Sequence, residues 1–252
     1  MNSGPENKKA LPLNLFIALS FAVFAILFFV FSGLLSGLDR ATVQGAAGPI
    51  KDAPIRFKQA DPLLTKMPGL SDVLDGPIIS SNDPVLGALA ANITLVEFSD
   101  FTCEFCRTQE KTLFSVLAAY PGQVKLIWKD YPDGNADSVS RQAAIAGRCA
   151  AAKGKFWPMH DLMFNEKNLD TGSIIALAEK LGFGGGEFRR CLADKNMKKL
   201  VDDNIREANA LDIKGVPFIF VNEKGFLGEV SLEELTTTVE SEIKKLQNPN
   251  AK

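Results

Sequence analysis

Apolar residues form one long run near the start of the chain and shorter runs after residue 90. The long run covers residues 15–38, contains no charged residue and is rich in Phe, Leu, Ile, Val and Ala. About 20 apolar residues cross a bilayer as a helix, whereas the apolar part of a signal peptide has about 7–15. The pattern therefore favours an uncleaved transmembrane anchor, preceded by a cytoplasmic N-terminus of residues 1–14. Cleavage near Ala47 remains the alternative.

Residues 39–82 show no sustained period of apolar positions and contain repeated prolines. Such a composition is typical of a linker. A folded domain is then expected over residues 83–252.

Within that domain, the apolar run at residues 93–98 predicts a strand, and residues 107–120 after it have a helical pattern. A second strand is predicted at residues 123–129. A helical block extends from residue 138 to about 212, with separate helices expected at about 155–165, 171–181 and 193–210.

After this block, the runs 218–221 and 226–227 flank the turn signal Asn222–Gly225, which predicts a hairpin. Ser231 begins a capping-box pattern and an amphipathic last helix. The order predicts an α/β domain with an all-helical insertion at about residues 135–212.

Cys103 and Cys106 stand at the junction between the first strand and the first helix. Free N–H groups and the helix dipole stabilise a thiolate at a helix N-terminus, and the thiolate is the attacking species in disulfide exchange. Cys106, three residues on, is close enough to resolve a mixed disulfide. The sequence therefore predicts a thiol–disulfide switch.

The charge of the chain argues against nucleic-acid binding. The formal net charge is −2, so nucleic-acid binding has no electrostatic support.

Cys149 and Cys191 fall in predicted helices of the insertion and outside any Cys-x-x-Cys motif. We expect them to form a structural disulfide worth about 2–4 kcal/mol, with two separate buried thiols as the alternative. A zinc site that uses all four cysteines is not favoured, because no second ligand pair has finger-like spacing.

Three segments together resemble the DsbA-type branch of the thioredoxin superfamily, in particular its membrane-anchored bacterial members. They are Val96–Cys106, Gly154–Phe164 and Gly215–Asn222. The resemblance covers about residues 82–246. It implies a thioredoxin fold with a helical insertion, Cys103 as nucleophile and Cys106 as resolving thiol. It implies no bound cofactor and no metal.

The resemblance also implies that the Val216–Pro217 bond is cis and faces the disulfide. Proline lacks an N–H group, so the backbone of Val216 would be left to pair with an extended substrate. We expect Phe105 and Glu104, between the two cysteines, to contact the substrate as well.

Glu97 is an acid inside an apolar strand, where an unpaired charge is unfavourable. It lies six residues before Cys103, where DsbA-type proteins carry a buried acid beneath the active site. We expect a raised pKa and proton transfer to or from Cys106. The alternative is an exposed strand edge or end.

The sequence departs from the best-known family members, which have Pro-His between the cysteines. Glu104 opposes a thiolate, by about 0.7 kcal/mol at ~6 Å in a watery setting. We therefore expect a less oxidising pair. His160, the sole histidine, is expected to be structural.

The resemblance suggests oxidation of cysteine-containing secreted or surface proteins, with reoxidation by a quinone-coupled membrane oxidase of the DsbB or vitamin-K-epoxide-reductase type. Lys8 and Lys9 before the anchor favour a cytoplasmic N-terminus. Persistent disulfides need an oxidising compartment, which places the domain in the periplasm or at the cell surface. An isomerase or reductase is the first alternative, and a non-catalytic chaperone-like module is the second.

Overall fold

The computed structural model describes residues 74–248 of the chain. The expected N-terminal segment 1–14, the expected anchor 15–38 and most of the expected linker 39–82 lie outside these residues. Across residues 74–248, no helix is both long and apolar enough to span a bilayer.

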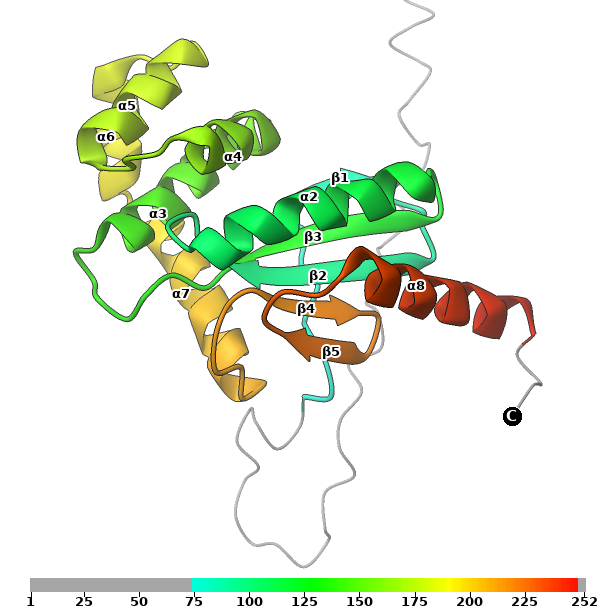
Figure 1. The fold of residues 1–252 in the computed structure, drawn as a ribbon. Helices are drawn as coiled ribbons and strands as arrows, with labels where there is room; N and C mark the ends of the chain where they lie inside the picture. The colour runs from blue at the N-terminus through cyan, green and yellow to red at the C-terminus, as the bar shows by residue number, and fades with distance from the viewer. Residues whose placement is uncertain (1–73, 249–252) are drawn as a thin grey trace, which may run out of the picture. The chain divides into compact units, whose positions relative to one another are not determined.

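Two parallel strands form the centre of a five-stranded sheet (Figure 1). They are β2 (Ile93–Ser99) and β3 (Val124–Asp130), and α2 (Glu104–Ala119) connects them. Both strands therefore end at the same edge of the sheet, and the Cys103–Cys106 segment begins there.

Shorter antiparallel strands complete the sheet on both sides, in the order β1-β3-β2-β4-β5. β1 (Val85–Gly87) pairs with β3. The hairpin of β4 (Phe218–Val221) and β5 (Lys224–Leu227) pairs with β2 through β4. The predicted hairpin is confirmed.

Successive strand residues point to opposite faces of the sheet. Leu95 packs with residues of α2 and α8 (Leu232–Gln247), and Val96 packs with the end of α7 (Lys195–Ala210) on the other face. Figure 1 shows α2 and α8 on the near face of the sheet and α7 behind it. Glu97 shares the face of Leu95 and therefore lies under α2.

The predicted helical insertion is confirmed as a bundle at one side of the sheet (Figure 1). Before α7 it consists of α3 (Val139–Ala151), α4 (Phe156–Asn165), α5 (Thr171–Lys180) and α6 (Gly185–Ala193). A disulfide joins Cys149 of α3 to Cys191 of α6, with a Cα–Cα distance of 5.9 Å. The expected pairing is confirmed.

Three local predictions were wrong or incomplete. The first helix begins at Glu104, three residues earlier than predicted, because Cys103 itself caps it. The strand β1 was not predicted, since three residues are too few for a recognisable pattern. The helix α6 was not separated from the rest of the helical block.

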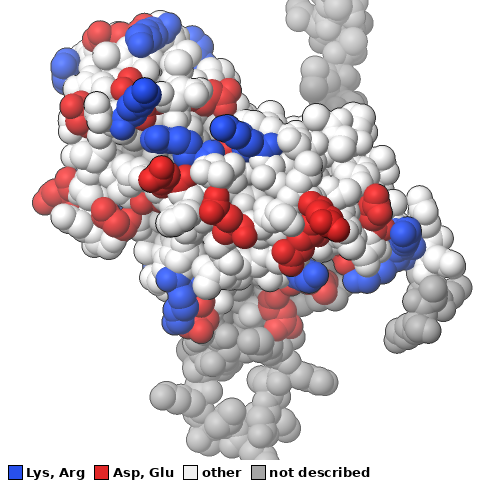
Figure 2. Space-filling view, viewed as in Figure 1, with Lys and Arg blue, Asp and Glu red and all other residues white. Residues whose placement is uncertain are grey.

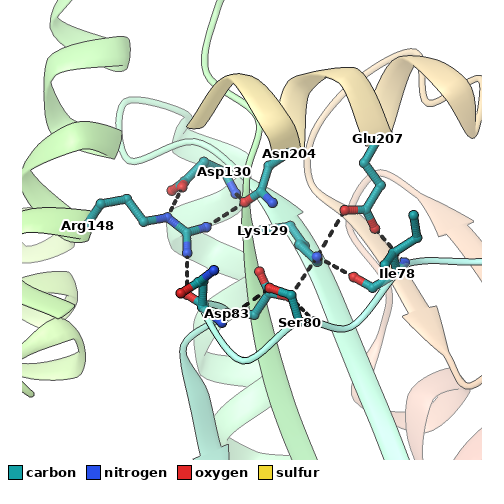
Figure 3. Close-up of polar contacts among 9 residues, drawn as sticks. Ile78, Ser80, Asp83, Lys129, Asp130, Arg148, Asn204 and Glu207 are labelled. Atoms are coloured by element: carbon teal, nitrogen blue, oxygen red, sulfur yellow. Dashed lines mark hydrogen bonds and ion pairs between the residues drawn. The ribbon is translucent and has the colours of Figure 1, made fainter. Parts of the chain in front are cut away.

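A buried ionic network attaches the segment before β1 to the rest of the domain (Figure 3). Lys129 Nζ lies 2.8 Å from Asp83 Oδ2 and 3.0 Å from Glu207 Oε2, and it also donates to the carbonyl oxygen of Ile78. Glu207 accepts a second hydrogen bond from the N–H of Ile78. Part of the expected linker therefore contacts β3 and α7 directly.

A second group of contacts continues this network toward α3 (Figure 3). Arg148 pairs with Asp130, and it also donates to the side chain of Asn204 and to the carbonyl of Asn82. Asp130 accepts from the ring N–H of Trp128 at 2.8 Å. The network thus joins the end of β3 to the helical insertion.

Candidate active site

Cys103 caps the N-terminus of α2 with its own side chain. Its backbone is extended, and its Sγ accepts a hydrogen bond from the N–H of Cys106 at 3.2 Å. Asp100 holds the preceding turn: its carbonyl accepts from the N–H of Cys103 at 3.1 Å and its Oδ1 from the N–H of Thr102 at 2.8 Å. The sulfur therefore lies at the positive end of the helix dipole.

The pKa of Cys103 is lowered to about 7, chiefly by its hydrogen bond with the Cys106 side chain. Partial burial and the charge of Asp100 oppose the shift, while N–H groups at the helix start support it. Since the side chain is only half-buried, a large fraction of Cys103 is an accessible thiolate at neutral pH and can attack a disulfide. Geometry and charge both suit a nucleophile.

Cys106 lies in the first turn of α2 and is fully buried. Its pKa is raised, first by burial and then by its hydrogen bond to Cys103, while Ser99 acts in the opposite direction. Cys106 therefore remains a thiol while Cys103 is a thiolate. For Cys106 to attack a mixed disulfide, a nearby base has to take its proton.

The backbone of Val216 lies against Cys103. The Val216 carbonyl oxygen is 3.8 Å from Cys103 Sγ, and the Val216–Pro217 bond is cis, as the resemblance implied. Pro217 is buried and its carbonyl accepts from the N–H of Gly228 at 2.8 Å, whereas Val216 is partly exposed. Contact between Val216 and a substrate stays a prediction.

Large apolar side chains are exposed beside this pair. Phe105, between the cysteines, is 63% exposed, and Glu104 beside it is exposed as well. Leu227 at the end of β5 is 60% exposed and lies close to Gly215, next to Val216. Sequence reasoning selected Phe105 and Glu104 but missed Leu227, which only the hairpin register brings near the active site.

Glu97 lies beneath the active site at the centre of the sheet, and the alternative of an exposed strand edge is wrong. It is fully buried, with Trp128 beside it on β3 and Ile219 beside it on β4. Neither carboxylate oxygen has a hydrogen-bond partner within residues 74–248. Burial and then the nearby charge of Glu110 raise the pKa of Glu97 well above its usual value. The expected shift is therefore present.

Two further polar residues accompany Glu97, and sequence reasoning missed both. Ser99 is buried two residues later on the same strand face, and it acts to lower the pKa of both Glu97 and Cys106, although its hydroxyl has no hydrogen-bond partner within residues 74–248. Glu110 is buried on α2, one helical turn after Cys106. The strand period of two and the helical spacing of four were the signals that could have identified them.

His160 of α4 is buried beside Glu110. Its Nε2 lies 3.3 Å from Glu110 Oε1, and its Nδ1 lies 3.0 Å from Asp161 Oδ1. Burial disfavours the charged ring, but the contacts with Asp161 and Glu110 outweigh burial and raise the pKa of His160. The lone histidine thus belongs to the polar surroundings of the active-site helix.

This arrangement is competent for thiol–disulfide exchange: an activated sulfur at the surface, a buried resolving thiol and a buried acid with a raised pKa below it. Within residues 74–248, no group of three or more His, Cys, Asp or Glu side chains could hold a metal ion.

Comparison with known proteins agrees with this architecture. A family model described as thioredoxin matches residues 80–241, more than half of the chain. The crystal structure of oxidised BdbD from Bacillus subtilis has a TM-score of 0.59 and 24% sequence identity, and the match covers 67% of this chain and 96% of that one. This likeness concerns the fold.

Two curated relatives differ in how much of their length is matched. The probable disulfide bond formation protein D of Bacillus cereus is 28% identical over 176 residues, which cover 66% of this chain and 81% of that protein. The Na(+)/H(+) antiporter NhaA 3 of Salinispora tropica is 30% identical over 190 residues, or 75% of this chain and 28% of the antiporter. The chain thus spans little more than a quarter of that antiporter.

The chain belongs to the thioredoxin family, in the DsbA-type branch whose fold contains a helical insertion.

Proposed function

We propose that the protein is a membrane-anchored thiol:disulfide oxidoreductase that forms disulfides in extracytoplasmic proteins. The observation that carries the proposal is the asymmetry of the cysteine pair. Cys103 is half-exposed with a pKa of about 7, whereas Cys106 is buried with a raised pKa. Only Cys103 can therefore meet a substrate, and only Cys106 is protected from it.

In the oxidising direction, a substrate thiolate attacks Cys103 Sγ of the Cys103–Cys106 disulfide. The bond between the two cysteines breaks, a substrate–Cys103 bond forms, and Cys106 leaves as a thiolate that takes a proton from Glu97. A second substrate thiolate then attacks the substrate sulfur and releases Cys103 as a thiolate. The substrate loses two electrons, and the protein pair gains them.

The backbone of Val216 would pair with the substrate chain, while Phe105 and Leu227 would contact apolar substrate side chains. Their exposure beside Cys103 supports this role. Glu104, exposed beside Phe105, would face the same substrate.

The apolar run 15–38 supports an anchor with the catalytic domain on the periplasmic or cell-surface side. The Cys149–Cys191 disulfide supports an oxidising compartment. Reoxidation would come from a quinone-coupled membrane oxidase of the DsbB or vitamin-K-epoxide-reductase type. The name of the Bacillus cereus relative, probable disulfide bond formation protein D, supports electron flow from substrate to protein.

One observation favours a second candidate, a reductase or isomerase. The nucleophilic cysteine has a pKa of about 7 in thioredoxin and about 3.5 in DsbA, and Cys103 lies at the thioredoxin end of this range. A higher pKa means that the thiolate of the reduced form is less stabilised, so the disulfide form is favoured and the pair is a weaker oxidant.

The reduction potential of the Cys103–Cys106 pair in the full chain separates the two candidates. We expect equilibration with glutathione buffers to give a value between the two references, closer to the about −120 mV of DsbA than to the about −270 mV of thioredoxin. A value at the thioredoxin end would assign the protein as a reductase. Capture of cysteine-containing proteins by a Cys106→Ser variant, through Cys103, would identify the substrates.

A further inference from the structure

A hollow of about 410 Å³ lies beside the active-site helix, between α2 and α4. Its lining includes Arg107, Glu110 and Lys111 from α2 and His160 and Asp161 from α4. On the face seen in Figure 2, Lys and Arg side chains gather where the helical insertion meets α2. The hollow is open to solvent and ends against two buried titratable groups, Glu110 and His160.

Several polar atoms at this hollow are buried without a hydrogen-bond partner among residues 74–248. They are Arg107 Nε, both carboxylate oxygens of Glu110 and Nε2 of His160. His160 Nε2 and Glu110 Oε1 are 3.3 Å apart, but their alignment does not make a hydrogen bond. Because buried polar atoms are almost always hydrogen-bonded, water is their natural partner in a polar hollow of this size.

The polar groups continue inward from the hollow to the resolving cysteine. Glu110 is close enough to Glu97 to raise its pKa. Ser99, buried on the same strand face as Glu97, acts to lower the pKa of both Glu97 and Cys106. Outward, Nδ1 of His160 contacts Asp161, whose side chain is 57% exposed.

Aromatic rings surround His160 everywhere else. Its ring lies within 6.0 Å, between ring centroids, of Phe101, Phe114, Trp128, Phe156, Trp157 and Phe164. The titratable groups that contact His160 are therefore Glu110 on α2 and Asp161 on its own helix. These six rings, which we call the aromatic box, do not accept or release protons. A proton can therefore reach His160 from Glu110 on the inner side and from Asp161 on the outer side.

We propose that His160 and the hollow carry the proton that Glu97 exchanges with solvent in each half-reaction. This inference rests on the proposed function. When Cys106 leaves as a thiolate, it takes a proton from Glu97; Glu97 is then reprotonated through Glu110 by the His160 imidazolium, which recovers its proton from water in the hollow. When Cys106 attacks a mixed disulfide on Cys103, its proton leaves by the same groups in reverse, and no electrons move along this path.

The test is single-turnover reduction of the oxidised full chain by dithiothreitol, followed by acid quenching, for the wild type and for His160→Ala. We expect the variant to be at least about ten-fold slower, since general acid–base groups contribute about 10²–10⁴. Imidazole added to the buffer should restore the rate, because the hollow can admit it. Pyrazole, which has the same ring size but is too weakly basic to carry a proton at neutral pH, should not.

A packing control is Phe164→Ala, which opens the same aromatic box without removing a proton carrier. Its rate should not respond to imidazole. An unchanged rate in His160→Ala, equal rescue by pyrazole, or equal acceleration of Phe164→Ala by imidazole would each overturn the role of His160.

If His160→Ala does not fold, His160→Gln keeps a polar side chain of similar reach. It should still slow the turnover and increase the solvent isotope effect, and an unchanged isotope effect would contradict the proposal. A wild type that does not react with dithiothreitol would refute the proposed function itself. A reactive wild type with an equally fast, folded variant would refute only the inference about His160.

Discussion

Cys103 accepts, through its own sulfur, the hydrogen bond of the Cys106 N–H at 3.2 Å. The nucleophile is thus the N-cap of the helix that contains its resolving partner. A side chain at this position accepts backbone hydrogen bonds and lies at the positive end of the helix dipole, and both stabilise its thiolate.

The first prediction concerns the titration of Cys103. In the reduced protein, its alkylation by iodoacetamide should increase with pH around a midpoint near 7, because its pKa is about 7. Cys106 should remain unmodified across this range, since it is buried and its pKa is raised. Mass spectrometry of digested protein assigns the site, and modification of Cys106 first would contradict the structure.

The two residues between the cysteines should adjust the reduction potential. Replacing Glu104-Phe105 with Pro-His removes an acid and adds a group that can stabilise the Cys103 thiolate. The reduced form then becomes more stable, so the potential should rise toward the about −120 mV of DsbA. Equilibration with glutathione measures this change, and a fall in potential would show that the argument from charge is wrong.

Glu97→Gln should change the pH dependence of stability. A carboxyl whose pKa is raised on folding binds its proton more tightly in the folded state, so the wild type loses stability as pH rises from about 4.5 to the folded pKa. The loss amounts to about 1.4 kcal/mol per pH unit over that interval. The variant lacks this loss, so its free energy of unfolding relative to that of the wild type should increase as pH rises.

Urea unfolding at several pH values measures this difference. Glu104→Gln is the matched control, because Glu104 is exposed and its replacement should change stability by less than about 0.5 kcal/mol at any pH. In the same Glu97 variant, disulfide exchange should slow and lose part of its pH dependence. Parallel pH profiles for wild type and Glu97→Gln would refute both the burial argument and the proton role.

Much of the fold could be predicted because its signals are local. The apolar run before Cys103, the helical pattern after it and the turn at Asn222 each lie within a few residues. The residues of the Gly215–Asn222 segment were enough to imply the cis bond before Pro217. The Cys149–Cys191 pairing was favoured because the other two cysteines already had a role.

The polar surroundings of the site could be predicted only in part. Glu97 was identified because an acid stands out in an apolar strand. Glu110 and His160 are ordinary residues in amphipathic helices. The strand β3 and the helix α3 separate them along the chain, and only tertiary packing brings them within 3.3 Å. The same limit applies to Lys129, whose partner Glu207 is 78 residues away.

Lys129 provides the last prediction, because it is a buried cation between two acids (Figure 3). Lys129→Met retains the apolar stem but leaves Asp83 and Glu207 without their cation. Removing one partner from a buried ionic group destabilises a protein by about 3–5 kcal/mol, so we expect a loss of that size in urea unfolding. The segment around Ile78 should also become open to limited proteolysis, since Lys129 donates a hydrogen bond to the carbonyl of Ile78.

Lys199→Met is the control for this prediction. The pair of Lys199 with Asp203 is exposed, and its loss should change stability by no more than about 1 kcal/mol. Equal effects of the two substitutions would mean that the buried network does not hold this segment in place.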